Sequence, residues 1–230
     1  MKYKKIDTKL FIKNRKNFVN KLERKSIAFF NSNDIYPISA DSTLPFDQHR
    51  DIFYLSGIDQ EESLLVLFPD SKDIEYKEML FLRETNEYIT HWEGEKLTKE
   101  QAKNISGINN IFWLGEFEDI LKEVLSQADF VYINTNEHYR QNVQTQTRED
   151  RFINRLKNIN GLKFKKSNPI LQKQRSVKDQ IEIELIKNAC EITKKGFERV
   201  LTFIKPGVWE YEIEAEFSHE FLRNRSRRFA

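Results

Sequence analysis

The sequence predicts an α/β protein, with a mixed β-sheet flanked by helices and a second, helical region after it. Short apolar runs of strand length alternate with amphipathic segments up to about residue 173. Two long amphipathic helices then follow, so we expect one domain over residues 1–173 and the start of another over residues 174–230. The length of 230 residues, about one and a half average domains, favours the same division.

The elements of the first domain are predicted from periodicity and turn residues. Apolar spacing of three to four residues predicts helices, which we place at 8–24, 98–105, 117–125 and 146–160. Short apolar runs predict strands, which we place at 26–30, 51–57, 63–69, 79–82 and 130–133. The run 63–69 is apolar on both faces, which is typical of a central strand. Pro37 and Pro45 indicate a long loop over 33–50, and a second loop is expected around His91–Gly94.

The second region has the most regular helical pattern. Ser176–Asp179 resembles a capping box with Asp in the place of Glu, and an apolar stripe follows it as far as Ile204. Pro206 and Gly207 end this helix, and a further helix is predicted by apolar residues at four-residue spacing: Trp209, Ile213, Phe217 and Phe221. Two such helices cannot bury all of their apolar faces on each other. We therefore expect the second domain to be incomplete where the sequence ends at Ala230.

The composition is that of a globular chain and excludes several functional classes. Hydrophobic residues make up 39% of the chain, charged residues 32%, and the net charge of +2 gives no overall field that recruits nucleic acid. The glycines include no pair with the spacing of a P-loop or dinucleotide-binding motif. A single cysteine, Cys190, and well-separated histidines exclude multi-cysteine zinc sites and the H-E-x-x-H motif. The sequence shows neither a signal-peptide core nor a long apolar window, so we expect a cytoplasmic protein that binds neither membrane nor nucleic acid.

Two loop segments carry most of the candidate site residues. Asp47–Asp51 gathers two carboxylates, an imidazole and a guanidinium, groups that could orient a substrate or bind a divalent ion. Polar loop residues more commonly satisfy backbone amides, and we favour this structural interpretation. Within His91–Gly94, Trp92 has the character of a recognition residue, although a core anchor has the same composition.

The remaining candidates favour structural interpretations. Cys190 falls on an apolar helix face, where a thiol acts as a small hydrophobic group. His219 and Glu220 are adjacent on a helix and point about 100° apart, so we do not expect them to form a dyad. A basic cluster near the carboxyl end is chemically suited to phosphate but is more commonly a solvated face. It consists of Arg223, Arg225, Arg227 and Arg228.

Several motifs, in order, resemble those of the Xaa-Pro aminopeptidase (aminopeptidase P) family. The segment 44–57, LPFDQHRDIFYLSG, followed by the apolar residues 64–67, is similar to the signature of the family's N-terminal domain. His91–Gly94 resembles the family's Trp-x-Gly loop. Asp47 and Arg50 depart from the pattern, because the family usually has Arg at the first position and commonly Ser at the second.

The likeness continues into the second region. Residues 175–182, RSVKDQIE, resemble the stretch with which the family's catalytic domain begins, and 205–219 continue the pattern. The resemblance implies a creatinase/prolidase-type N-terminal domain with an RNase H-like sheet, followed by the first helices of a pita-bread α+β domain.

The resemblance also implies a reaction. The family removes the N-terminal residue that precedes proline, at two divalent metal ions, commonly manganese, held by two Asp, a His and two Glu. Those ligands lie downstream of the Pro-Gly turn, so the resemblance assigns no catalytic and no metal-holding residue to this sequence. We expect these 230 residues to be inactive by themselves and to serve oligomerisation and the shaping of the substrate cleft.

Trp92 is the substrate-binding candidate that the resemblance indicates. The family places its N-terminal domain in oligomer contacts and at the rim of the active site, which suggests that Trp92 borders the site of its own or a neighbouring subunit. The implied partners are peptides with proline at the second position and further copies of the chain. Two alternatives stay open: a prolidase- or creatinase-type pita-bread hydrolase, and a non-catalytic interaction module of the same fold.

Overall fold

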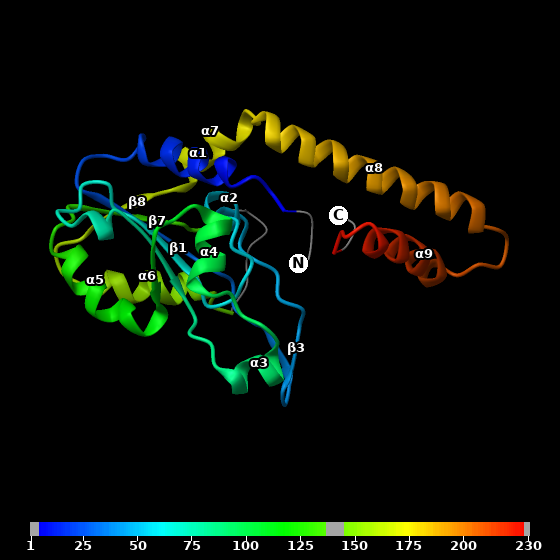
Figure 1. Ribbon diagram of the computed structural model, residues 1–230, viewed down its shortest axis with the longest axis horizontal. Helices are drawn as coiled ribbons and strands as arrows, with labels where there is room; N and C mark the ends of the chain where they lie inside the picture. Colours follow the sequence, from blue (N-terminus) through cyan, green and yellow to red (C-terminus); the bar gives the residue numbers. More distant parts are fainter. Residues whose placement is uncertain (1–4, 137–144, 228–230) are drawn as a thin grey trace. The chain divides into compact units, whose positions relative to one another are not determined.

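The computed structural model describes residues 5–136 and 145–227, which form two compact units (Figure 1). The larger unit comprises residues 8–136 and 145–176, and the smaller one comprises residues 5–7 and 177–227. The domain division at residue 173 stays a prediction, because the compact units of one structure do not by themselves define family domains.

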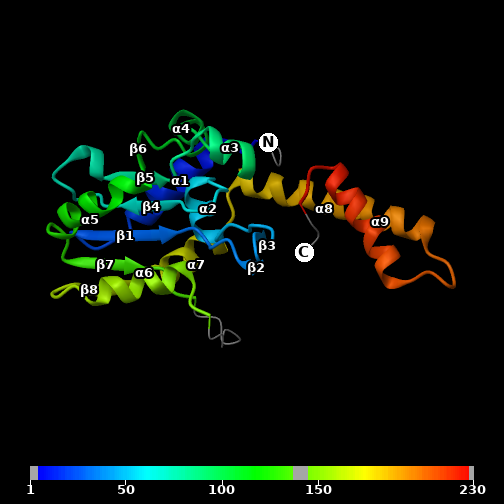
Figure 2. The same cartoon turned by 90° about the horizontal axis from the view of Figure 1, so that it is seen from below.

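The larger unit is built on a six-stranded mixed sheet, with its strands in the order β6-β5-β4-β1-β7-β8 (Figure 2). The strands are β1 (Ser26–Asn31), β4 (Leu64–Leu67), β5 (Glu78–Leu82), β6 (Asn110–Trp113), β7 (Phe130–Ile133) and β8 (Lys163–Lys166). β4 is antiparallel to both β1 and β5, and the other neighbouring pairs are parallel. β1 and β4 are buried along their whole length, which confirms the central strand that the doubly apolar run predicted.

Helices cover both faces of this sheet and give each face its own core. One face packs against α1 (Thr8–Val19), α2 (Arg50–Ser56), α4 (Lys99–Ser106) and α7 (Asn168–Ser176), and the other packs against α5 (Phe117–Leu125) and α6 (Arg148–Lys157). Alternation along the strands divides the side chains between the cores. The register pairs Phe29 with Val66 on the α5/α6 face and Phe30 with Leu65 on the opposite face.

Smaller elements complete the larger unit. They are the exposed hairpin of β2 (Pro37–Ser39) and β3 (Ser42–Thr43), helix α3 (Glu87–Glu93), and the 3-10 turns η1 (Ile74–Tyr76) and η2 (Leu114–Glu116). Figure 1 shows α3 and the hairpin at the same end of the unit.

Residues 51–57 form most of α2 and its cap, so the strand predicted there is wrong. His49 caps the first turn with its side chain, and Gly57 ends the helix in the left-handed region, at a φ of 71°. Within the helix Ile52 and Leu55 are buried, three residues apart, whereas a half-buried strand buries alternate residues. Apolar and aromatic composition suggested a strand, but the caps and the spacing favour a helix.

The loop predicted around His91–Gly94 is also wrong in its first part, which is helical. Asn86 caps α3, and the chain leaves the helix at Gly94, with a φ of 82°. α3 spans only seven residues, too few for a repeating apolar pattern to predict a helix, and none of them is buried. The half-exposed strands β6 and β8 and the helix α7 were missed as well, and β8 reads Lys-Phe-Lys-Lys, which carries almost no strand signal.

The smaller unit contains the two predicted helices, α8 (Gln180–Phe203) and α9 (Glu210–Arg223). Their rings meet edge to face at Phe197 and Phe217, whose centroids lie 5.1 Å apart. A Cβ at Gly196 would lie 3.0 Å from the Phe221 ring, so glycine permits this close approach of the helices. No helix within the described residues combines the length and the apolar character needed to cross a membrane.

Candidate functional site

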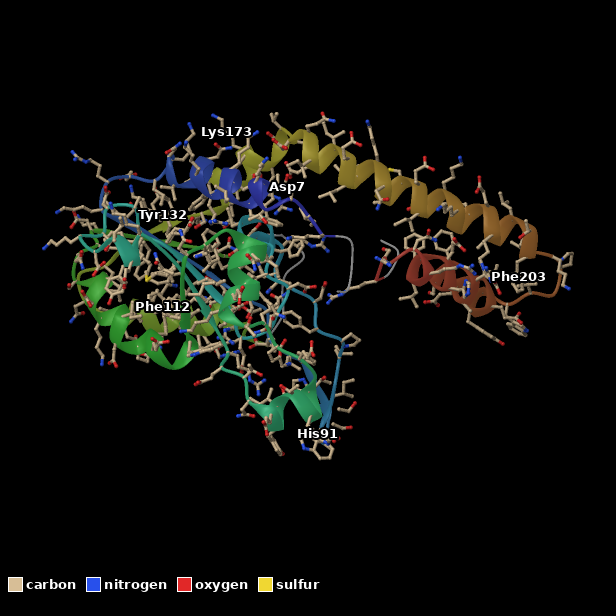
Figure 3. All side chains as sticks on the ribbon, viewed as in Figure 1. Asp7, His91, Phe112, Tyr132, Lys173 and Phe203 are labelled. Atoms are coloured by element: carbon tan, nitrogen blue, oxygen red, sulfur yellow. The ribbon has the colours of Figure 1, made fainter. Side chains whose placement is uncertain are left out.

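The substrate-binding candidate Trp92 lies on α3 with its side chain 70% exposed, so the alternative interpretation as a core anchor is wrong. His91, labelled in Figure 3, packs edge-on against its ring, with the centroids 4.9 Å apart. Tyr88, one turn earlier on the same helix, is 72% exposed. Helix α3 therefore presents an aromatic face to solvent, and an exposed indole of this kind can pack on an apolar ring or side chain of a ligand.

The polar segment Asp47–Asp51 mainly builds the entry to α2. Gln48 is buried, and its amide donates a hydrogen bond to the carbonyl oxygen of Ile58 at 3.1 Å. His49 Nδ1 accepts the amide proton of Asp51 at 3.3 Å. These two side chains have the structural role that the sequence favoured.

The pKa of His49 fits this role. Burial lowers it below the ordinary value of 6.5, the negative charge of Asp51 opposes the change, and the positive charges of Arg175 and Arg50 add to it. A neutral imidazole is required here, because Nδ1 serves as a hydrogen-bond acceptor. Asp47 and Arg50, the two residues that depart from the family motif, are both exposed.

Asp51 joins three elements that are distant in the sequence. Its Oδ1 accepts a hydrogen bond from Arg175 Nη1 at 2.6 Å, and its Oδ2 accepts one from Asn134 Nδ2 at 3.0 Å. The guanidinium of Arg175 also lies over the ring of Tyr54, 5.3 Å from its centroid. The start of α2, the end of β7 and the end of α7 therefore meet at one aspartate.

A cavity of 380 Å³ opens beside this pair. It is lined by Asp51, Asn168, Leu171, Gln172, Arg175 and Ser176. Asn168 Nδ2 donates to the carbonyl oxygen of Thr135 at 2.6 Å, while its Oδ1 is buried and accepts no hydrogen bond from the described residues. Since Asp51 is paired with Arg175, the two charges on the cavity wall largely cancel, and the lining also includes apolar surface such as that of Leu171.

Glu149, in the first turn of α6, is a buried ionisable group that the sequence did not reveal. Its Oε2 accepts hydrogen bonds from the backbone N–H of Asn31 at 3.2 Å and from Asn31 Nδ2 at 2.9 Å. Its Oε1 is buried as well. Burial raises the pKa of this carboxyl to about 7, against the hydrogen bonds from Asn31 and from the backbone of Asn134, which lower it. The sequence shows only a glutamate near a helix start, and nothing in it indicates burial.

In the smaller unit, Cys190 is exposed, so the apolar helix face on which the sequence places it is not buried at this position. Ile192 and Gly196 are the buried residues of α8, and position 190 lies about 200° around the helix from 192. His219 is exposed, while Glu220 Oε1 accepts a hydrogen bond from Asn224 Nδ2 at 2.7 Å, so the two adjacent residues form no dyad. The basic cluster is exposed at its described members, Arg223, Arg225 and Arg227, and Arg228 lies outside the described residues.

No group of three or more His, Cys, Asp or Glu side chains that could hold a metal ion occurs within residues 5–136 and 145–227. The described residues therefore do not fit a metal centre, and none of them is assigned to one.

Comparison with known protein families decides where the chain belongs. The family model described as "Aminopeptidase P, N-terminal domain" matches residues 11–132, more than half of the chain. The chain belongs to the aminopeptidase P family. A second model, described as "Metallopeptidase family M24", matches residues 184–230 of this aminopeptidase P chain.

Individual relatives agree with this assignment. The chain is 27% identical over 219 residues to the Xaa-Pro aminopeptidase of Escherichia coli (strain K12), and the alignment covers 94% of the chain and 49% of that relative. It is 24% identical over 191 residues to Xaa-Pro aminopeptidase 3 of Homo sapiens, with 82% of the chain and 37% of the relative covered. The chain thus spans about half the length, or less, of the curated relatives that it matches.

Solved structures confirm the predicted fold class. The low-pH form of Escherichia coli aminopeptidase P superimposes with a TM-score of 0.82 at 25% identity, covering 97% of this chain and 51% of that one. A zinc-substituted form of the same protein in complex with product gives a TM-score of 0.81 over the same shares of the two chains. The mixed sheet flanked by helices, followed by the first helices of a pita-bread domain, is therefore the architecture of this family.

Proposed function

We propose that this chain is the N-terminal portion of a metal-dependent Xaa-Pro aminopeptidase, which removes the N-terminal residue that precedes a proline. The observation that carries the proposal is the succession of two family matches in one chain, the N-terminal domain over 11–132 and the metallopeptidase over 184–230. The naming of relatives that align over most of the chain as Xaa-Pro aminopeptidases supports the same reaction.

In this proposal the two divalent ions, manganese, are held by the metallopeptidase portion of the parent enzyme. The metallopeptidase family match supports metal dependence, and no cluster in the described residues fits the ions. When bound, such ions activate a water molecule for attack on the peptide bond. The contribution of the present chain is then to place the substrate and to join subunits, and the 230 residues by themselves are inactive.

The larger unit is proposed to border the substrate cleft with Trp92, in its own or a neighbouring subunit of a homo-oligomer. The 70% exposure of Trp92 supports a contact of its indole with a ligand. The substrates are peptides with proline at the second position. A cytoplasmic location agrees with a chain whose single cysteine allows no internal disulfide.

The absence of activity is tested on the 230-residue chain with manganese and an Xaa-Pro peptide. We expect no release of the first residue, whereas the parent enzyme with its whole metallopeptidase domain should release it under the same conditions. Turnover by the purified 230-residue chain would contradict the proposed division of labour.

The role of Trp92 is tested in the parent enzyme by Trp92→Ala. Loss of an aromatic contact should lower kcat/KM for an Xaa-Pro peptide about tenfold, which corresponds to about 1.4 kcal/mol. Tyr88→Ala is the matched control, because it removes an equally exposed aromatic side chain from the same helix. If Trp92→Ala changes kcat/KM no more than Tyr88→Ala does, the assignment of Trp92 is wrong.

A further inference from the structure

Helix α3, which carries Trp92, is not held to the rest of the unit by a buried apolar face. None of its seven residues is buried. A helix of this length is not stable by itself in water, because the free-energy cost of nucleating it exceeds the stabilisation from the hydrogen bonds of two turns. If Trp92 has a defined place, interactions other than apolar burial must fix the helix.

An arginine fork holds the last turn of α3. Arg83 directly follows β5, whose last four residues are buried, so its backbone is anchored in the sheet. Its Nη1 and Nη2 donate to Glu93 Oε2 at 2.8 Å and to Glu93 Oε1 at 3.0 Å, a bidentate geometry. The hydrogen bonds from Arg83 lower the pKa of Glu93, so the carboxylate is charged at neutral pH. Because Glu93 adjoins Trp92, the fork grips the turn that carries the indole.

Further charges brace this fork. Lys96 and Glu61 are in contact, and the side chain of each is only 10% exposed. Lys96 Nζ also lies 3.7 Å from Glu93 Oε2, and Arg83 Nε lies 3.2 Å from Glu62 Oε2. The carboxylate of Glu93 is thus held between a cation from the end of β5 and a cation that is itself anchored on the loop before β4.

We infer that Arg83 and Lys96 are positioning residues, which hold Trp92 in place by clamping Glu93. The consequence for substrate rests on the proposed function, whereas the clamp itself does not. Since Arg83 and Glu93 are partly exposed, with side chains 24% and 39% accessible, salt should weaken the clamp. The order of α3 therefore depends on ionic strength, unlike that of helices held by a buried apolar face.

The clamp is tested by hydrogen exchange of the α3 amides in the 230-residue chain. Arg83→Met removes the guanidinium and keeps an apolar stem, and we expect exchange about fivefold faster in α3, the factor that loss of one partly exposed charged pair gives. Sodium chloride should speed this exchange in the wild type and have little effect in the variant.

Arg155→Met is the matched control, because Arg155 makes a similar two-pronged contact with Glu118, between α6 and α5 of the same unit. It should leave exchange in α3 unchanged. Glu93→Gln weakens the clamp from the other side and guards against a folding defect peculiar to position 83. Equal exchange in α3 for wild type, Arg83→Met and Glu93→Gln overturns the inference.

Activity of the parent enzyme then separates this inference from the proposed function. If both hold, Arg83→Met raises KM for an Xaa-Pro peptide about fivefold and leaves kcat nearly unchanged, because the indole is displaced but the chemistry is not altered. Suppose that Trp92→Ala lowers kcat/KM but Arg83→Met leaves KM unchanged. This result contradicts the positioning role of Arg83 and leaves the proposed function standing. A kcat/KM unaffected by Trp92→Ala overturns the assignment of Trp92, whatever the exchange rates show.

Discussion

The buried carboxyl of Glu149 should make the larger unit less stable as the pH rises. Burial raises its pKa from an ordinary value of 4.5 to about 7 in the folded chain. Between these two values the unfolded chain has lost a proton that the folded chain keeps, so the free energy of unfolding falls with increasing pH. The stabilising contribution is complete below about pH 4.5 and is lost above about pH 7.

The size of this effect follows from the two pKa values. They differ by about 2.5, and at about 1.4 kcal/mol for each pKa unit the whole contribution is about 3 kcal/mol. The amino-terminal end of α6 favours the charged form by up to about 1 kcal/mol, which reduces the contribution. Over the accessible range from pH 5 to pH 8 we therefore expect about 2 kcal/mol from this one group.

Glu149→Gln isolates the effect, because glutamine is neutral at every pH and its carbonyl oxygen can still accept the hydrogen bonds from Asn31. Urea unfolding is followed by the fluorescence of Trp113, which lies on β6 of the same unit, with Trp92 and Trp209 replaced by Phe. We subtract the free energy of unfolding of the chain with Glu149, the parent chain, from that of Glu149→Gln. This difference should rise by about 2 kcal/mol between pH 5 and pH 8. Other titrating groups are present in both chains and cancel in this difference.

Glu100→Gln is the matched control, since Glu100 also lies in the first turn of a helix, α4, but is exposed. Its difference from the parent chain should vary little with pH. A difference between Glu149→Gln and the parent chain that stays constant from pH 5 to pH 8 would show that the carboxyl is not neutral in the fold, and the reasoning from burial would fail.

Two further substitutions test the packing around α1 and α2. Gly57→Ala should lower the free energy of unfolding in urea by about 2 to 4 kcal/mol, because the new Cβ would lie 2.4 Å from the Phe11 ring and φ is 71°. Gly161→Ala is the control, since Gly161 also has a positive φ but has open space around it. It should lower the free energy of unfolding by only about 1 kcal/mol. Arg15→Met should cost about 2 to 3 kcal/mol, because the buried guanidinium bonds Glu78 Oε1 at 2.5 Å and the carbonyl oxygen of Leu55 at 2.8 Å. Adding Glu78→Gln should recover part of this loss in a double-mutant cycle, and the same cost in the single and double variants would refute the ion pair as its cause.

The parts of the fold that the sequence predicted are those in which the apolar pattern is strong. The predicted helix at 117–125 and strand at 130–133 coincide with α5 and β7. Most residues of α5 are buried in the α5/α6 core, and the buried residues of β7 are divided between the cores on the two faces of the sheet. Strand β8 was missed because an edge strand can be almost wholly charged when only one of its residues packs on the core. The segment 51–57 failed for a different reason, since its composition suits a strand while its caps at His49 and Gly57 impose a helix.

The contacts that place the candidate site residues are of the kind that periodicity cannot reveal. In the sequence Arg175 stands out only as the first residue of a family-like motif, and nothing in its neighbourhood indicates that it pairs with Asp51, 124 positions away. Lys96 and Glu61, 35 positions apart, are individually ordinary charged residues of a chain in which a third of the residues are charged. Charge pairs become specific only when the fold brings two elements together, whereas an apolar stripe is visible along a single element.

A helix held by ion pairs, such as α3, should tolerate substitution of the holding residues less well than a helix held by an apolar core. An apolar core accepts many substitutions of similar volume, because its attraction is not directional. A bidentate fork such as that between Arg83 and Glu93 requires its partner at a fixed place, and lysine at position 83 could not reproduce the geometry. Arg83→Lys should therefore speed hydrogen exchange in α3 nearly as much as Arg83→Met, although it preserves the charge. If Arg83→Lys instead keeps exchange at the wild-type rate, a positive charge at position 83, rather than the bidentate geometry of arginine, holds the turn that carries Trp92.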